Sequence, residues 1–213
     1  MWARITAAVA CAAWFAGLAP AAEYEFVWSP PGFIAGRGAN SSGLVAVRPA
    51  NPKSKFGGAI WNCETGRLQR VTWVKEPDAP AGLTAVNERG DAVGCFWDGY
   101  NQMARPFFWT DEGGLQEFKG LGGSQTSPRA VNNKGHVVGA ALPPKPTENN
   151  PLGNNAPQRA FRWTPESGIV DLGAALPKGE SSATAVNEEG WIAGYYVAGR
   201  RFTPVLWSPT NEM

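Results

Sequence analysis

Two short patterns of apolar and polar positions alternate along the chain, and both predict β-strands. The first is an apolar residue, any residue, tryptophan and a polar residue, as in 107–110 (FFWT). The second is Asn-x-x-Gly followed by an apolar pair, as in 132–138 (NNKGHVV). Short runs bounded by turn residues are typical of strands, and no window of ten residues beyond the N-terminal segment has a clean helical period. We therefore expect an all-β protein.

Both patterns recur at a nearly constant spacing. The asparagine of the second pattern stands at Asn40, Asn87, Asn132 and Asn187, so successive copies are 47, 45 and 55 residues apart. The longest interval holds a Pro- and Asn-rich insertion, Pro143 to Pro157, which we expect to be an exposed loop. The tryptophan of the first pattern recurs at Trp28, Trp61, Trp109, Trp163 and Trp207. A period in the mid-forties is the size of a β-propeller blade.

The signature residues of the second pattern have a physical role in a hairpin. The asparagine side-chain oxygen accepts hydrogen bonds from backbone N–H groups further along the turn, and the glycine takes the positive φ that closes it. A second glycine follows the apolar pair in three copies, at Gly94, Gly139 and Gly194. A residue without a side chain allows a neighbouring strand to approach closely. Val47 stands there in the first copy, which is therefore degenerate.

These residues resemble the bacterial HAF family of probable extracellular repeats. Its signature is a His-Ala-Phe-x-Trp strand, a Gly-x-x-x-Leu-Gly segment and an Ala-x-x-Asn-x-x-Gly-x-x-x-Gly hairpin. The copy that resembles it most spans 159–194 and has Arg159 in place of the name-giving histidine. The resemblance extends from Phe26 to Trp207. It implies a propeller-like, exported protein and no particular activity.

The repeat predicts a small β-propeller, or a propeller-like array, of about four short blades within one domain, 22–213. The expected units are 26–58, 59–106, 107–160 and 161–204, with a closing strand at 205–209. Because the chain begins and ends with the same tryptophan strand, we expect Trp28 or Trp207 to complete a shared terminal blade that protects the sheet edges. An unclosed array that dimerises is the structural alternative.

The first 21 residues have the features of an export signal. Arg4 precedes an apolar run from Ile5 to Leu18, and Ala19-Pro20-Ala21 provides an A-x-A cleavage site. Lipidation at Cys11 is the weaker alternative, because the apolar run before it is short. The apolar segment is shorter than a membrane-spanning helix needs, and no later segment is apolar enough. We expect a secreted or periplasmic protein that is not inserted in the membrane.

Composition supports the strand prediction and excludes one class of partner. The chain has 26 Gly, 18 Pro and 10 Trp, a profile rich in turns and aromatic residues. Its 19 basic and 18 acidic residues become 18 of each once Arg4 is removed with the signal. A neutral protein lacks the basic face that binding to nucleic acid requires.

Some aromatic residues are candidates for ligand contacts. The five tryptophans of the repeat could be a ring of sugar-stacking platforms, but a fixed register with apolar partners favours core positions. The tryptophans outside that register are better candidates for exposed contacts, and 95–101 (CFWDGYN) places aromatic, acidic and amide groups on one expected loop. An ordinary hairpin loop is the alternative. The candidate binding residues are Trp97, Asp98, Tyr100, Trp73 and Trp191.

Other reactive residues are few. Cys63 and Cys95 remain after processing, and in an oxidising compartment we expect them to form a disulfide, with two buried thiols as the alternative. His136 is the only histidine, at a position where Asp91 and Trp191 stand in sister repeats, so a catalytic role is not expected. No metal or phosphate-binding motif is present, and we expect no metal and no cofactor.

These observations predict an exported repeat protein that binds a glycan or a protein and is not an enzyme. Two alternatives remain open at this stage. A glycoside hydrolase or lyase would need a pair of carboxylates converging in a propeller channel. A purely structural surface repeat would need no ligand.

Overall fold

The chain folds into antiparallel β-sheets. The computed structural model describes residues 5–7, 24–26, 30–50, 58–71, 81–98, 103–144, 156–177 and 179–210. The first sheet contains β3 (Phe33–Ala39), β4 (Leu44–Pro49), β5 (Ala59–Asn62) and β6 (Leu68–Arg70). The second contains β7 (Ala81–Val86), β8 (Ala92–Asp98), β9 (Met103–Thr110) and β10 (Gly114–Glu117).

The third sheet contains β11 (Thr126–Val131), β12 (Val137–Ala141), β13 (Arg159–Thr164) and β14 (Gly168–Asp171), and is followed by a short 3-10 helix, η2 (Leu172–Ala175). The last sheet contains β15 (Glu180–Val186), β16 (Ile192–Ala198) and β17 (Arg201–Trp207). Apart from these, β1 (Ile5–Ala7) pairs with β2 (Tyr24–Phe26). No helix in the described ranges is long and apolar enough to cross a membrane.

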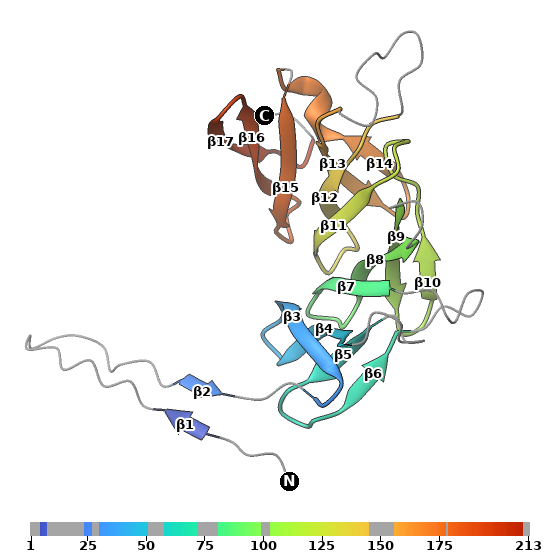
Figure 1. Ribbon diagram of the computed structural model, residues 1–213, viewed down its shortest axis with the longest axis vertical. Coiled ribbons are helices and arrows are strands. Elements are labelled where there is room, and N and C mark those ends of the chain that lie inside the picture. The colour runs from blue at the N-terminus through green and yellow to red at the C-terminus, as the bar shows by residue number, and fades with distance from the viewer. Residues whose placement is uncertain are drawn as a thin grey trace, which may run out of the picture.

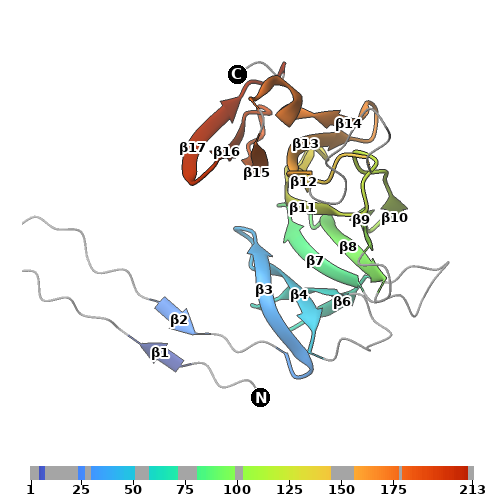
Figure 2. The same ribbon diagram turned by 45° about the horizontal axis from the view of Figure 1, so that its top comes forward.

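The four sheets form a propeller-like array, as the repeat predicted. Within each sheet, strands that are consecutive in sequence are neighbours. The sheets follow one another along an arc, from the β3 sheet at one end to the β15–β17 sheet at the other (Figures 1 and 2). Each sheet begins with the strand before an Asn-x-x-Gly hairpin, so its tryptophan strand comes third. The expected units began with the tryptophan strand and are therefore offset from the observed sheets.

The expected shared terminal blade is not formed by the described residues. Trp207 lies in β17, which is the third strand of the last sheet, and no fourth strand pairs with it in the described part of the chain. Trp28 lies outside the described residues, and β2 pairs with β1. Most of the expected signal peptide, 1–21, also lies outside them. The described sheets thus form an open arc, and the last sheet has three strands, with β17 at its edge.

The hairpin geometry confirms the predicted roles of asparagine and glycine. Gly90, Gly135 and Gly190 have φ values of 88°, 76° and 92°. In the third sheet, the Oδ1 atom of Asn132 accepts the backbone N–H groups of Lys134 at 3.1 Å and His136 at 2.9 Å. The asparagine side chain therefore supports the turn, and the glycine supplies the backbone conformation that other residues rarely adopt.

The second glycine of each repeat also has the predicted purpose. A Cβ atom on Gly139 would overlap the carbonyl oxygen of Ser127 on β11 and lie 3.0 Å from the Phe161 ring. Gly94 and Gly194 have equivalent contacts with Gly82 and Ser182. The close approach that these glycines allow is between neighbouring strands of one sheet, beside an aromatic ring of the third strand.

The repeated tryptophans are core residues, as their register predicted. Trp61, Trp109, Trp163 and Trp207 are all buried, while Trp28 lies outside the described residues. Trp109 packs in one cluster with Ile60 of the preceding sheet, and the Trp207 indole N–H donates to the Leu172 carbonyl of the third sheet at 3.3 Å. Each of these two tryptophans therefore contributes to the interface with the sheet before it, which explains their constant spacing.

Candidate binding site

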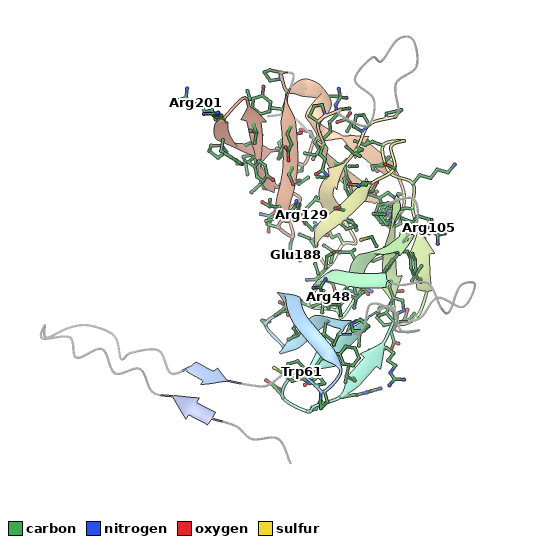
Figure 3. The ribbon with its side chains drawn as sticks, viewed as in Figure 1. Arg48, Trp61, Arg105, Arg129, Glu188 and Arg201 are labelled. Atoms are coloured by element: carbon green, nitrogen blue, oxygen red, sulfur yellow. The ribbon has the colours of Figure 1, made fainter. Side chains whose placement is uncertain are left out.

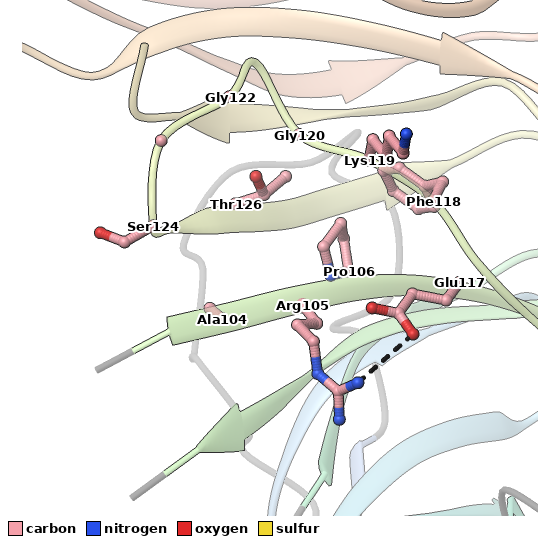
Figure 4. Close-up of a pocket in the computed structure, with 11 residues that line it drawn as sticks. Ala104, Arg105, Pro106, Glu117, Phe118, Lys119, Gly120, Gly122, Ser124 and Thr126 are labelled. Atoms are coloured by element: carbon pink, nitrogen blue, oxygen red, sulfur yellow. Dashed lines mark ion pairs between the residues drawn. The ribbon is translucent and has the colours of Figure 1, made fainter. Parts of the chain in front are cut away.

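A pocket opens between the second and third sheets. It has a volume of about 380 Å³ and is lined by the start of β9, the end of β10 and the segment that leads to β11 (Figure 4). Figure 4 shows the Pro106 ring between β9 and β11, and the Thr126 side chain on the side of β11 that faces the Gly120 segment. The Phe118 ring and the backbone of the glycine-rich segment 120–123 complete the walls. The pocket therefore combines apolar surface with backbone polar groups.

The glycine-rich wall is held in place from both sides. The Ala104 N–H of β9 donates to the Ser124 carbonyl at 3.0 Å, and the Gly123 N–H donates to the Leu142 carbonyl at 3.1 Å. A Cβ atom on Gly120 would overlap the Thr126 side chain, so this segment can pass so close to β11 only because it has no side chain there. The pocket is consequently preformed, as binding sites for small ligands usually are.

An ion pair lies beside the pocket. Arg105 Nη1 is 3.5 Å from Glu117 Oε2, and both side chains are about one-third exposed. Both residues are among those that line the pocket, and Figure 4 shows the Arg105 side chain on the opposite side of β9 from the Pro106 ring. The Arg105 guanidinium lies over the Phe96 ring, 5.5 Å from its centre, in a cation–π contact.

The predicted Trp97 segment borders this pocket. Trp97 and Asp98 are the last two residues of β8 and pair with Ala104 and Met103 of β9. The segment was expected to be a loop from 95 onward, but backbone pairing with β9 extends the strand through Asp98. Tyr100, Trp73 and the side chains of Trp97 and Asp98 lie outside the described residues.

Trp191 belongs to a different part of the molecule. It is 43% exposed, as predicted, but it lies in the Asn-x-x-Gly hairpin of the last sheet. Trp97 lies at the end of β8 that is far from the corresponding hairpin of its own sheet. Of the candidate binding residues in the described part of the chain, Trp97 and Trp191 therefore lie in different sheets and at different ends of them.

Sequence analysis missed the residues that form the pocket. Its lining includes Pro106, Phe118, Lys119 and Thr126, none of which was among the candidate binding residues. The sequence signal available was the glycine-rich run at 119–124 (KGLGGS) directly after a strand. Without the sheet-to-sheet contact, this run reads only as a turn.

The expected disulfide is not present. Cys63 lies in the turn after β5 of the first sheet, where its sulfur is close to Gly43. Cys95 lies within β8 of the second sheet, opposite Gly82 and Pro106. No bond joins the two cysteines. The prediction of a disulfide is therefore wrong, because the two thiols belong to different sheets and sequence spacing does not report their separation.

His136 is part of a hairpin. Its backbone N–H donates to Asn132, and burial lowers the pKa of its imidazole, with Arg162 and Lys134 lowering it further. Its Nδ1 atom is buried without a hydrogen-bond partner among the described residues. No group of three or more His, Cys, Asp or Glu side chains within those residues is arranged to hold a metal ion.

Comparison with known proteins supports the fold. No family model matches the chain, and no curated protein does. The chain is similar to the crystal structure of Porphyromonas gingivalis dipeptidyl peptidase 4, with a TM-score of 0.52 and 11% identity over 79% of this chain and 23% of that one. A streptogramin B lyase structure is also similar, with a TM-score of 0.44 and 15% identity over 83% of this chain and 54% of the lyase. The chain thus spans less than two thirds of either protein.

The first of these similarities corrects one expectation. The repeat pattern led us to expect that the chain is not an enzyme, and the comparison contradicts this, because the same arrangement forms part of a peptidase chain. The architecture therefore does not argue against catalysis. At this level of identity the similarity shows the fold alone, and it assigns no reaction to this chain.

Proposed function

We propose that this protein is an exported binding module and that it holds a saccharide unit of a glycan in the pocket between β9 and β11. The observation that carries the proposal is the preformed pocket itself. Its volume of about 380 Å³ lies in the range of small-ligand sites, which are commonly 300–1,000 Å³. Export is inferred from the N-terminal sequence, and the resemblance to HAF repeats is in keeping with it.

The lining of the pocket fits a sugar. A saccharide presents apolar C–H faces and a rim of hydroxyl groups. Pro106 and Phe118 provide apolar surface, while Thr126, Lys119 and the backbone of 120–123 provide hydrogen-bonding groups. A protein partner would bury a wide surface, about 800 Å² on each side, rather than enter a single pocket, so we favour a glycan.

Neighbouring segments can extend the site. The pocket lies at the end of the sheets where β8 leads into β9 and where β12 leads into the insertion of 143–157. Leu142 and Pro144, at the start of that insertion, contact the glycine-rich wall. Contacts from loops on a rigid scaffold commonly provide specificity. The Trp97 segment and residues 142–144 are therefore the described places where a longer glycan would extend, and the rest of the expected loop, 145–155, lies outside the described residues.

A glycan array with the exported protein tests this proposal. We expect a hit, and we expect Lys119→Ala to weaken binding to it about tenfold, because Lys119 lies on the pocket rim. Trp97→Ala tests the predicted aromatic contact and should weaken binding further. Lys134→Ala is the matched control, since it removes an exposed lysine from a hairpin at the other end of the sheets.

Two results would contradict the proposal. One is an array without hits. The other is a hit whose affinity is unchanged by Lys119→Ala and by Trp97→Ala, because the ligand would then bind outside the pocket.

A further inference from the structure

The last sheet has an apolar face that no described residue covers. The three large hydrophobic side chains that are exposed in the described part of the chain all belong to it: Trp191 at 43%, Phe202 at 71% and Leu206 at 55%. Phe202 and Leu206 alternate along β17 with Val205 and Trp207, which pack toward the third sheet. Phe202 and Leu206 therefore point away from the array.

The same face of an earlier sheet is an interface. Phe108 precedes Trp109 in β9 as Leu206 precedes Trp207 in β17, and Phe108 is buried with its ring centre 5.9 Å from that of Trp163 in the next sheet. Val93, which pairs with Phe108, is fully buried, whereas Ala193, which pairs with Leu206, is exposed. The last sheet thus presents to solvent the surface on which another sheet would stack.

Hydrogen bonds between the hairpins give this interface a direction. The Nδ2 atom of each repeat asparagine donates to the backbone carbonyl of the next one: Asn40 to Asn87 at 2.8 Å, Asn87 to Asn132 at 3.0 Å, and Asn132 to Asn187 at 2.8 Å. We call this series the asparagine ladder. Neighbouring residues add to it, because the Ser41 backbone N–H and hydroxyl bind the Glu88 carboxylate of the next hairpin.

The two ends of the ladder are complementary. Among the described residues, Asn187 Nδ2 has no carbonyl to donate to. The Asn40 carbonyl likewise accepts no hydrogen bond from an asparagine side chain of another hairpin in those residues. At the same end as Asn40, the buried Trp61 indole N–H has no partner in the described residues, whereas the equivalent N–H of Trp207 binds the preceding sheet. Within the described ranges, no sheet therefore stacks before the first sheet or after the last one.

We propose that the last sheet of one chain stacks on the first sheet of a second copy, with Asn187 donating to Asn40 across the junction. Figure 3 labels Trp61 in the first sheet and Glu188 in the last, the two sheets that end the arc, with Glu188 on the side that faces the middle of the molecule. Two copies joined in this way at both ends form a ring of eight sheets, and propellers commonly contain four to eight. A head-to-tail contact that repeats in this manner closes a two-fold symmetric ring.

Edge pairing along β17 is the less suitable mode of association. Pro204 stands three residues before Trp207, as Pro106 stands before Trp109. The Pro106 carbonyl accepts the Phe118 N–H, so the backbone of this position points toward the fourth strand. Pro204 therefore places a residue without an N–H on the outer edge of β17, a feature that hinders strand addition.

Light scattering with size-exclusion chromatography tests the assembly of the exported protein. We expect a mass of two chains at tens of micromolar, and we expect Leu206→Glu to raise the dissociation constant at least tenfold. The control Gln116→Glu, which places a glutamate at an exposed position of β10, should leave the dissociation constant unchanged. A mass of one chain at all concentrations overturns the proposal, because a segment of the same chain would then cover these faces. Masses above two chains overturn the closed ring.

Cross-linking tests the orientation. By analogy with Ser41 and Glu88, residue 188 of one copy should lie beside residue 41 of the other. On a Cys63→Ser background, a mixture of Glu188→Cys and Ser41→Cys chains should form a disulfide-linked dimer under mild oxidation, and neither variant should do so alone. A cross-link formed by Glu188→Cys alone would show that two last sheets pack against each other, and would overturn the head-to-tail arrangement.

Discussion

The asparagine ladder predicts that one substitution has different costs at two equivalent positions. Asn132 and Asn187 occupy the same place in successive hairpins. The Asn132 side chain makes three hydrogen bonds: to Lys134 N–H, to His136 N–H and to the Asn187 carbonyl. Among the described residues, the Asn187 side chain makes one hydrogen bond, which it accepts from the Trp191 N–H at 2.8 Å. At about 1 kcal/mol for each bond lost, Asn132→Ala should destabilise by about 3 kcal/mol and Asn187→Ala by about 1.

Urea denaturation followed by tryptophan fluorescence measures this difference. The protein should be dilute enough for scattering to report single chains, so that Asn187 is not in a junction. Asn132→Asp separates the two roles, since it keeps the oxygen that accepts the turn N–H groups and replaces the donor that binds the next sheet. We expect Asn132→Asp to lower the free energy of unfolding too, because it places a carboxylate oxygen against the carbonyl oxygen of Asn187. Equal losses for both alanine variants, or an Asn132→Asp variant as stable as the parent, would refute the inter-sheet role of the ladder.

Three further outcomes follow from the structure. Burial lowers the pKa of His136, so the unfolded chain binds its proton first; stability should fall as the pH drops below about 6.5, and His136→Asn should reduce that fall in urea midpoints between pH 7.5 and 5. Gly139→Ala should destabilise by about 1–3 kcal/mol because of overlap with β11, while Gly82→Ala, with open space around it, should change the thermal midpoint little. A reducing agent should leave the thermal midpoint unchanged, because Cys63 and Cys95 are not bonded. A marked drop in the midpoint would show that the two cysteines do form a disulfide.

Local roles were the part of the structure that sequence reasoning predicted well. Turn closure by Gly135, capping by the side-chain oxygen of Asn132 and the close approach at Gly139 each involve residues near one another in the chain. The buried position of Trp163 also followed from its register with apolar neighbours. These predictions succeeded because hairpin geometry restricts the residues at each position.

Contacts between sheets were the part that sequence reasoning missed. The disulfide was wrong because Cys63 and Cys95 are in neighbouring sheets at places that spacing does not relate. Two of the binding candidates, Trp97 and Trp191, lie at different ends of different sheets, which the sequence spacing does not report either. The pocket itself depends on the distance between β9 and β11, which belong to different sheets.

The sequence alone determined that this chain forms short antiparallel strands in about four repeated sheets, because turn and packing requirements within one sheet act over a few residues. Only the tertiary structure decided how those sheets meet. It directed the side-chain NH2 groups of Asn40, Asn87 and Asn132 to the carbonyl of the next hairpin, formed a pocket beside the glycine-rich segment, and left one apolar face of the last sheet exposed among the described residues. The hydrogen bonds between hairpins join residues that stand 45 to 55 positions apart and come together only when the sheets stack.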